Sequence, residues 1–471
     1  MKTSKFLEHI KTRFKKIVVV DTEFQSDISN SYCTKALCAV YKDLNTGQVL
    51  KIWDHEENNL AQHHFDFETT LFVCFYATAE AGYFLRQLMG RPPWMFDCWT
   101  EYSKLYKNSR ELSLLACATA YSYPNPISKE EKDRFRDMCI KQNTWSKKVR
   151  EQILNYCYGD VLMNEHVFYK ILNDLENICG NDYETLLEQA LARGQSMVCY
   201  AKAQYNGIPF DTPKLNDFNT YWLLVRNAVI KKINAELNLW TDDCKFSHDK
   251  FYSLIKKLDL LGEWPLTPKG RLKTNTETFE LFDDYYPEIK KLKRIKGLLD
   301  STKLTEFVVS EDGRYRPYKG YKPFGTHTGR CTPSSKWIFG TAKWARSFIK
   351  PSFGCAIVNL DFKSQETFIA AVLSGDENML ASYNSGDTYM NTAILAGMAP
   401  EGATEEYYPE VRQVWKTIVL ASNYGQGARG LSKGLRKYGK TYSEVAGFLM
   451  KYKEIYKTYF DWAGAKSITL R

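Results

Sequence analysis

Two acidic residues near the start of the chain follow a run of apolar residues. Residues 17–20 are Ile-Val-Val-Val, which predicts a buried strand, and Asp21 and Glu23 come directly after it. Side chains two apart on a strand point to the same face, so these carboxylates would repel each other unless a cation lay between them. Because Mg²⁺ prefers oxygen ligands, the pair indicates a site for a divalent metal ion, although a turn at the strand end would also explain it.

A tyrosine and another carboxylate stand farther along the chain at helical spacing. Tyr156 and Asp160 are four residues apart, which places them one turn apart on one face of a helix. Together with Asp21 and Glu23 they resemble the DEDD superfamily of 3′–5′ exonucleases, in the subtype whose last motif contains a tyrosine. The resemblance implies a ribonuclease H-like α/β domain in which four carboxylates bind two Mg²⁺ ions that promote attack of water on a phosphodiester, with the tyrosine orienting the water.

The fourth carboxylate of this pattern has two candidates. The stretch at the family-like spacing ends at Glu80, where the family usually has an aspartate a few residues after an asparagine, so the resemblance assigns Glu80. Asp97, in a Phe-Asp pair, is the alternative. A glutamate carboxylate lies one methylene farther from the backbone, which would alter the metal geometry, and Glu80 could also be an ordinary acid on a helix surface.

A second group of candidate residues lies in the last third of the chain. Residues 355–360 predict a strand that ends at Asp361, and Glu366 stands five residues later. Four residues at a spacing of four then form one stripe on a predicted helix: Arg412, Lys416, Leu420 and Tyr424. Gly425 fits a cap that ends this helix. Two cations one turn apart suit a triphosphate, whereas the simpler interpretation is a cationic surface stripe.

Taken together, these residues are similar to the motifs of DNA polymerase family A, the group that contains bacterial polymerase I and many phage replicases. Asp361 to Glu366 matches motif A, and Arg412 to Gly425 matches motif B without a gap. The resemblance implies template-directed DNA synthesis with 3′–5′ proofreading, acting on primer–template DNA and dNTPs. It also implies a second pair of Mg²⁺ ions, held by the catalytic Asp361 and the carbonyl group of Phe362.

The resemblance implies a set of dNTP-binding residues: Gln365, Glu366, Arg412, Lys416, Leu420 and Tyr424. Arg412 and Lys416 would hold the triphosphate and offset its developing charge, which makes Lys416 a catalytic residue. Glu366 would lie under the sugar and exclude a 2′-hydroxyl, and Tyr424 would stack at the templating position. Leu420 replaces the usual Phe or Tyr and cannot make the same ring contact with the sugar, which predicts altered discrimination against dideoxynucleotides.

The implied DNA-binding residues are Thr328, Gly329, Arg330, Gly425, Lys293 and Arg294. Thr328-Gly329-Arg330 matches a family motif whose arginine reaches the primer terminus. Lys293 and Arg294 belong to the basic run at residues 290–296, for which a solvated helix face and contacts to backbone phosphates are the two alternatives.

The composition places few further limits on function. The chain has 471 residues, 44% of them hydrophobic, and a net charge of +9, which mildly favours an anionic partner such as nucleic acid. Its twelve cysteines are scattered without a CxxC pair, which argues against a disulfide scaffold or a zinc site and favours buried thiols in a reducing cytoplasm. No apolar run approaches the ~20 residues of a membrane helix, and the start lacks a secretory signal, so we expect a cytoplasmic protein of a bacterial or phage-infected cell.

The motifs divide the chain into four expected regions. They are a 3′–5′ exonuclease domain at 1–185, an α-rich thumb and the start of the polymerase domain at 186–310, an incomplete α+β palm with motif A at 311–404, and incomplete fingers with motif B at 405–471. Within the thumb, Thr212 predicts a helix N-cap before Pro213, and apolar residues at spacings of three and four from Leu215 to Leu237 predict one apolar face of a long helix.

One element of the polymerase pattern is missing from the sequence. Family members carry a second catalytic aspartate in motif C, usually His-Asp-Glu, well beyond motif B, and the 46 residues after Gly425 contain no such triplet. The sequence leaves three explanations open: a split gene whose partner chain supplies motif C, a truncated or interrupted chain, or a polymerase region that only holds DNA. The corresponding alternative function is a 3′–5′ exonuclease that acts alone, with the polymerase portion as a DNA-binding module.

Overall fold

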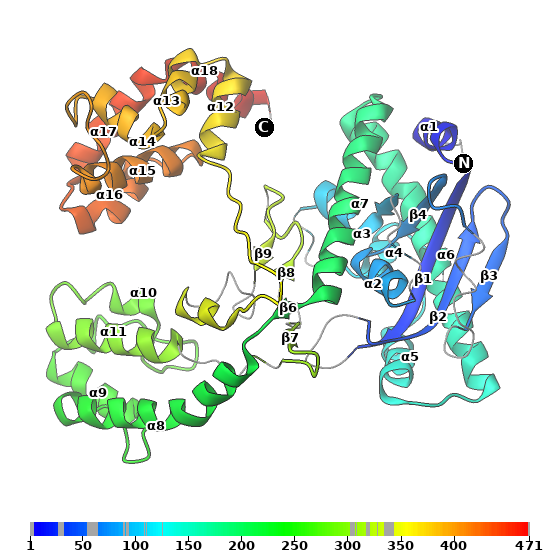
Figure 1. Ribbon diagram of the computed structural model, residues 1–471, viewed down its shortest axis with the longest axis horizontal. Helices are drawn as coiled ribbons and strands as arrows, with labels where there is room; N and C mark the ends of the chain where they lie inside the picture. The colour runs from blue at the N-terminus through cyan, green and yellow to red at the C-terminus, as the bar shows by residue number, and fades with distance from the viewer. Residues whose placement is uncertain are drawn as a thin grey trace. The chain divides into compact units, whose positions relative to one another are not determined.

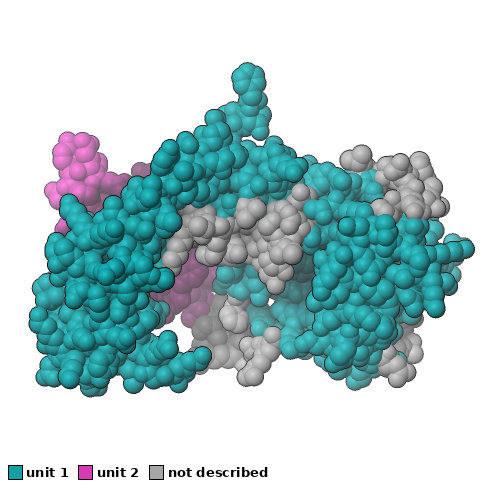
Figure 2. All heavy atoms as spheres, turned by 90° about the horizontal axis from the view of Figure 1, so that it is seen from below, with its two compact units in different colours: residues 1–357 teal, residues 358–471 magenta. Residues whose placement is uncertain are grey.

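The structure is a computed structural model that describes residues 4–26, 33–53, 65–87, 90, 94–107, 109, 111–124, 126–301, 307, 309–316, 321–326, 328–333 and 343–469. The chain forms two compact units, residues 1–357 and 358–471, which Figure 2 distinguishes by colour. Each unit is described by itself. None of the helices in the described ranges combines the length and apolar composition needed to cross a membrane.

A five-stranded mixed sheet forms the centre of the N-terminal region (Figure 1). Its strands are β1 (Lys16–Gln25), β2 (Lys35–Asp43), β3 (Val49–Ile52), β4 (Thr70–Cys74) and β5 (Met95–Asp97), in the order β3-β2-β1-β4-β5. β1 pairs antiparallel with β2 and parallel with β4. The predicted strand at 17–20 is confirmed but extends farther, so Asp21 and Glu23 lie within β1 rather than beyond it.

Helices cover both faces of this sheet. Alternate residues of β1 enter opposite cores: Ile17 and Val19 pack on one side, and Val18 and Val20 on the other. The surrounding helices are α1 (Lys5–Arg13), α2 (Thr78–Arg86), α3 (Cys98–Leu105), α4 (Leu114–Ala120), α5 (Lys129–Lys141), α6 (Lys147–Cys179) and α7 (Tyr183–Asn206). The sheet is therefore buried on both sides, as expected for an α/β domain.

Helix α7 begins close to the predicted boundary at residue 185. It packs on the sheet by a very close approach at Gly194, where an added Cβ atom would lie 1.9 Å from the carbonyl oxygen of Met95 on β5. Its apolar residues enter both cores of the sheet, with Leu187 on one side and Met197 on the other. By its packing, α7 is part of the α/β domain.

The next region is helical and has its own core. It contains α8 (Thr212–Leu237), α9 (His248–Lys257), α10 (Thr276–Phe279) and α11 (Pro287–Ser301), packed around Trp240, Phe251 and Trp264. Two short pairs follow: β6 (Ile208–Pro209) with β7 (Arg314–Tyr315), and β8 (Tyr321–Lys322) with β9 (Thr332–Pro333). A 3₁₀ helix, η2 (Lys343–Phe348), lies farther along.

Two predictions for α8 need correction. The N-cap is Asp211 rather than Thr212, because the Asp211 carboxylate accepts the backbone N–H of Lys214. The predicted apolar face is covered only toward its ends, by packing around Leu215 and around Ile230. Val225, in the middle of the predicted face, is 51% exposed, because no neighbouring element in the described residues packs over that turn.

Residues 358–471 form a helical unit. Its helices are α12 (Gln365–Ser374), α13 (Glu377–Asn384), α14 (Thr388–Leu395), α15 (Pro409–Asn423), α16 (Ala428–Leu435), η3 (Arg436–Tyr438), α17 (Tyr442–Ile455) and α18 (Lys457–Thr469). They pack around Trp415, Tyr452 and Tyr456, which are almost completely buried. The helical C-terminal region that the sequence predicts is confirmed.

The strand predicted at residues 355–360 does not form. This segment is extended, without a hydrogen-bonded partner strand among the described residues, and Val358 and Leu360 are 74% and 88% exposed. The β-branched pattern alone cannot make a strand, because a strand needs a neighbour to satisfy its backbone groups.

Candidate functional site

Three of the predicted metal ligands converge in the α/β domain. Asp21 and Glu23 on β1 and Asp160 on α6 each present a carboxylate oxygen, and these oxygens all lie within 4.8 Å of one another. One oxygen of Asp21 and one of Asp160 are buried without a hydrogen-bond partner in the described part of the chain. Close carboxylates with unused oxygens fit a hard divalent cation such as Mg²⁺.

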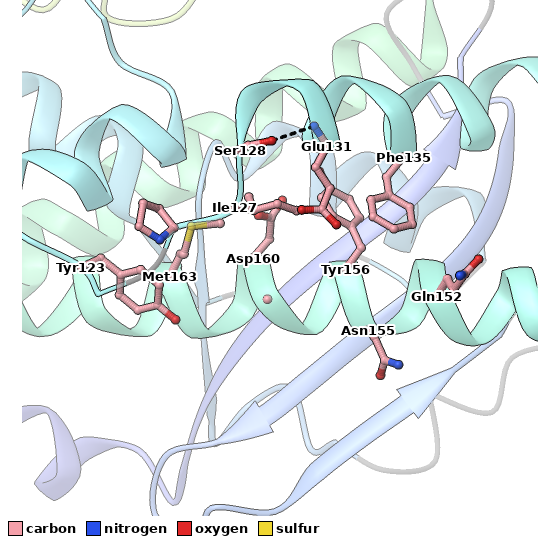
Figure 3. Close-up of a pocket in the computed structure, with 12 residues that line it drawn as sticks. Tyr123, Ile127, Ser128, Glu131, Phe135, Gln152, Asn155, Tyr156, Asp160 and Met163 are labelled. Atoms are coloured by element: carbon pink, nitrogen blue, oxygen red, sulfur yellow. Dashed lines mark hydrogen bonds between the residues drawn. The ribbon is translucent and has the colours of Figure 1, made fainter.

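The predicted helical pair Tyr156 and Asp160 lies along a pocket of about 490 Å³ between α6 and α5 (Figure 3). Tyr156 is buried and stacks on Phe135 of α5, with ring centroids 4.9 Å apart. The placement of both residues on one face of α6 confirms the spacing argument. The pocket wall also contains the amide side chains of Gln152 and Asn155, and of the three clustered carboxylates it includes Asp160.

The carboxylates influence one another's ionisation. Withdrawal from water, followed by the charge of Asp160, raises the pKa of Asp21 to about 7. Burial and the charges of Asp21 and Asp160 likewise raise the pKa of Glu23 well above its usual value. Burial and the same negative charges raise the pKa of the Tyr156 phenol, which keeps it protonated. The metal-free site therefore retains protons that a cation would displace.

Lys132 is a member of the site that sequence reasoning missed. It reaches from α5, and its Nζ lies 2.9 Å from Oδ2 of Asp160 and 5.9 Å from the centre of the Tyr156 ring. Burial lowers the pKa of Lys132, but Asp160, Asp21 and Glu23 outweigh this and raise it. Lys132 thus supplies a positive charge beside the carboxylates, and no residue spacing in the sequence indicates this.

The two candidates for the fourth carboxylate have different surroundings in the structure. Asp97 is fully buried and caps α3, where it accepts hydrogen bonds from the backbone of Tyr76, Ala77 and Trp99 and from the hydroxyl of Thr100. Glu80, on the first turn of α2, is only 3% exposed, so it is not a surface acid. Its carboxylate lies outside the cluster of three, yet Oε2 has no partner among the described residues.

Substitutions at these two positions are expected to have opposite effects. Asp97→Ala should lower the free energy of unfolding by about 2–3 kcal/mol, because it leaves buried hydrogen-bond donors without an acceptor. The Mg²⁺ dependence of DNA digestion should be kept. Glu80→Gln should keep or raise stability, because burial and Asp21 raise the Glu80 pKa, but it should slow metal-dependent digestion. Denaturant unfolding and DNA digestion of both variants test this, and the reverse pattern would assign Asp97 instead.

The raised pKa of Asp21 predicts a pH-dependent stability of the metal-free protein. Folded Asp21 keeps its proton to higher pH than the unfolded chain does, so stability is lost as the pH rises from about 4 to about 7. In EDTA we therefore expect the unfolding temperature to fall between about pH 4 and 7, and Mg²⁺ to raise it more at pH 7 than at pH 4. Thermal unfolding of wild type and Asp21→Asn checks this, since the asparagine should flatten the profile; an unchanged profile in the variant would contradict it.

In the second unit, the predicted stripe lies on α15. Val414, Trp415 and Ile418 bury one face of this helix, and Arg412, Lys416 and Leu420 are half-buried on the other. The helix ends at Asn423, and Tyr424 is its C-cap residue. Gly425 follows with φ of +80°, a conformation that favours glycine, as the predicted cap requires.

Arg412 already has anionic partners. Its guanidinium donates to Asp387 at 2.7 Å and to Glu405 at 3.1 Å, two residues that the sequence did not single out. Arg412 and Lys416 also lie over the ring of Tyr389, at 5.4 and 5.8 Å from its centre. A triphosphate would have to exchange with these carboxylates to bind the arginine.

The motif A residues lie beside the same helix. Asp361 and Phe362 are exposed in the extended segment before α12, and Gln365 and Glu366 form the first turn of α12. The Tyr424 hydroxyl donates to the Glu366 carboxylate at 3.4 Å, so two of the predicted dNTP-binding residues meet.

The predicted DNA-binding residues are separated. Thr328, Gly329 and Arg330 form a turn between β8 and β9, which is closed by hydrogen bonds between Thr326 and Arg330. Lys293 on α11 is paired with Asp283 and Glu280, which neutralise its charge, whereas Arg294 is exposed. The basic run is therefore partly an internal ion-pair network, and Arg294 keeps the accessibility that a phosphate contact needs.

Comparison with known proteins identifies the second half of the chain. Residues 251–467 match the family model described as DNA polymerase family A. These residues belong to DNA polymerase family A. The family A region includes the stripe on α15 and the motif A residues, while the α/β domain lies outside it.

Relatives come from bacteria and phages. The chain is 26% identical to "DNA polymerase I, thermostable" of Thermus thermophilus over 220 residues, which are 44% of this chain and 25% of that protein. It is 27% identical to the DNA polymerase of Escherichia phage T5 over 324 residues, 60% of this chain and 36% of the relative. The chain thus matches only a quarter to about a third of the length of these two relatives.

A solved structure has a similar fold over almost the whole chain. The POL domain of Pol1 from M. smegmatis, in complex with DNA primer-template and dNTP, matches with a TM-score of 0.65 and 16% identity, covering 98% of this chain and 76% of that one. At this identity the match shows the fold alone. The comparisons do not support the separate C-terminal chain that the missing motif C brought into consideration.

Proposed function

We propose that this chain carries out template-directed DNA synthesis with 3′–5′ proofreading. The family A match over residues 251–467, with Arg412 and Lys416 on α15 and Tyr424 capping its end, is the observation that carries the synthetic function. The substrates are primer–template DNA and dNTPs, and each active site takes two Mg²⁺ ions.

In the nuclease site, side chains of this protein bind the metal ions and orient the attacking water. Asp21, Glu23 and Asp160 bind the ions, and Glu80 completes the set of carboxylates. Tyr156, kept protonated, orients the attacking water, and the pocket beside it accepts the 3′-terminal nucleotide. When bound, the ions supply the positive charge that activates water and stabilises the displacement at phosphorus. We infer a ribonuclease H-like exonuclease domain from this arrangement on a mixed sheet.

In the polymerase site, Asp361 and the Phe362 carbonyl hold the ions, and Arg412 and Lys416 hold the triphosphate. The carboxylate of Glu366, which accepts a hydrogen bond from the Tyr424 hydroxyl, excludes a 2′-hydroxyl on the incoming nucleotide. Arg330, with Thr328 and Gly329, contacts the primer terminus. Arg294 and Lys293 contact backbone phosphates without reading sequence.

A primer on a longer template tests the proposal directly. A 5′-labelled primer is incubated with the chain and Mg²⁺, with and without dNTPs. We expect shortening without dNTPs and extension with them. Shortening in both reactions would favour the alternative, a 3′–5′ exonuclease that acts alone, with the polymerase region as a DNA-binding module. Neither shortening nor extension would refute both.

Leu420 offers a test of nucleotide selectivity. Leu420→Phe should place a ring beside the incoming sugar and change the ratio of dNTP to ddNTP incorporation by about tenfold, an effect of ~1–3 kcal/mol. Single-nucleotide incorporation by wild type and variant, side by side, measures this ratio. Equal discrimination by the two proteins would show that position 420 does not contact the sugar.

A further inference from the structure

Three lysines line a small pocket in the first unit, away from the residues assigned above. Lys104 comes from α3, Lys107 from the turn that follows this helix and Lys322 from β8, and together with Trp99 and Phe324 they line a cavity of about 160 Å³. The α3 and β8 residues are more than 200 positions apart in the sequence, so only the fold brings these charges together. The volume suits a phosphate or part of a sugar–phosphate unit.

The three lysines lack an acidic partner in the described part of the chain. None of the three forms an ion pair with a residue that the structure describes, although Glu101 lies on the same helix as Lys104. Glu101 is already bound by Arg193, which donates two hydrogen bonds to its carboxylate at 2.6 and 2.8 Å. Burial, and then the positive charges of Lys107 and Arg193, lower the pKa of Lys104. The pocket therefore has excess positive charge, which favours an anion.

The pocket adjoins the turn that presents Arg330. A Cβ atom added to Gly329 would lie 2.9 Å from Nζ of Lys104, and the same Nζ lies 5.2 Å from the centre of the Phe324 ring. Gly329 has φ of +82°, so the turn is shaped by its glycine and passes directly over the lysine. A polyanion held at Arg330 would continue onto Lys104.

We propose that Lys104, Lys107 and Lys322 bind the phosphodiester backbone of single-stranded DNA next to the turn at residues 328–330. This inference rests on the proposed function, because it takes DNA as the substrate. A recess with lysines on two sides admits a phosphate from a strand that can bend, whereas duplex phosphates lie on a stiff, regular ridge. The adjacent aromatic rings are typical of sites that accept unpaired nucleotides.

The test is equilibrium binding of fluorescein-labelled dT12 by anisotropy, in EDTA so that no DNA is degraded. Each phosphate contact contributes a slope of about 0.7 in log K against log salt for single strands. Lys104→Gln with Lys107→Gln should therefore weaken binding about 20-fold at ~0.1 M salt and reduce the slope by about 1.4. Adding Lys322→Gln should weaken it further.

The matched control is Lys5→Gln with Lys15→Gln. Both lysines are exposed in the same unit, and replacing them removes the same amount of charge. We expect its dT12 affinity to stay within about twofold of wild type, where net charge alone would act. Unchanged binding by the Lys104/Lys107 variant, or an equal loss in the control, would overturn the site. If the Lys104/Lys107 variant lost as much affinity for a blunt DNA duplex as for dT12, the proposed preference of the site for single strands would be overturned. If the wild type extends primers and the Lys104/Lys107 variant binds dT12 with wild-type affinity, the proposed lysine site is refuted and the proposed function stands.

Discussion

Asp21→Ala combined with Glu23→Ala is expected to reduce 3′–5′ digestion at least about 10³-fold while leaving DNA binding intact. Two of the three close carboxylates are removed. Asp160, already paired with Lys132, and Glu80, which lies outside the close cluster, cannot hold the ions without them. Divalent ions contribute several kcal/mol to such reactions, which corresponds to this loss. The measurement is the rate of shortening of 5′-labelled single-stranded DNA in Mg²⁺, with binding measured separately in EDTA.

A variant with the same change in charge separates this effect from a general one. Glu151→Ala with Glu401→Ala removes two exposed acids outside both candidate sites and should digest DNA at the wild-type rate. Removing the repulsion between Asp21 and Glu23 should also raise the unfolding temperature in EDTA, so loss of digestion by the double variant cannot be attributed to unfolding. Undiminished digestion by the double variant would mean that the nuclease assignment is wrong.

Lys416→Ala is expected to lower kcat/KM for single-nucleotide incorporation by roughly 10²–10³-fold. The loss follows from removing one fixed positive charge at the triphosphate, an effect comparable to removing one preorganised donor. Lys416, unlike Arg412, has no carboxylate partner among the described residues, so its charge is available to the substrate. Incorporation of one dNTP is measured across a range of dNTP concentrations.

Lys433→Ala is the matched control for this substitution. Lys433 is exposed on the neighbouring helix α16, and its removal should leave kcat/KM within about twofold of wild type. The same kcat/KM in Lys416→Ala as in wild type would exclude the stripe on α15 from triphosphate binding.

Local sequence patterns predicted those parts of the proposed nuclease site that depend on a single helix or strand. The two-residue spacing of Asp21 and Glu23 and the four-residue spacing of Tyr156 and Asp160 follow directly from strand and helix geometry. Lys132 could not be found in this way, because its contact with Asp160 depends on how α5 packs against α6. A spacing rule does not reach across two elements.

The same limit explains the polymerase region. The stripe and the cap at Gly425 belong to one helix and were predictable, whereas the partners of Arg412 come from outside that helix. The strand expected at 355–360 depends on a neighbouring strand, so its apolar pattern was an insufficient signal. Residue patterns indicate an element's own faces, and tertiary packing decides which charges meet.

The packing of α7 determines where the α/β domain could be excised. A fragment that stopped at residue 185 would lose buried residues from both cores, including Leu187, Leu191 and Met197. Each such side chain is worth roughly 1–3 kcal/mol, and together they approach the ~5–15 kcal/mol that holds a whole domain folded. A self-sufficient fragment with the proposed nuclease site would therefore have to extend to Asn206. Proteolysis between residues 185 and 206 would destroy the domain rather than release it.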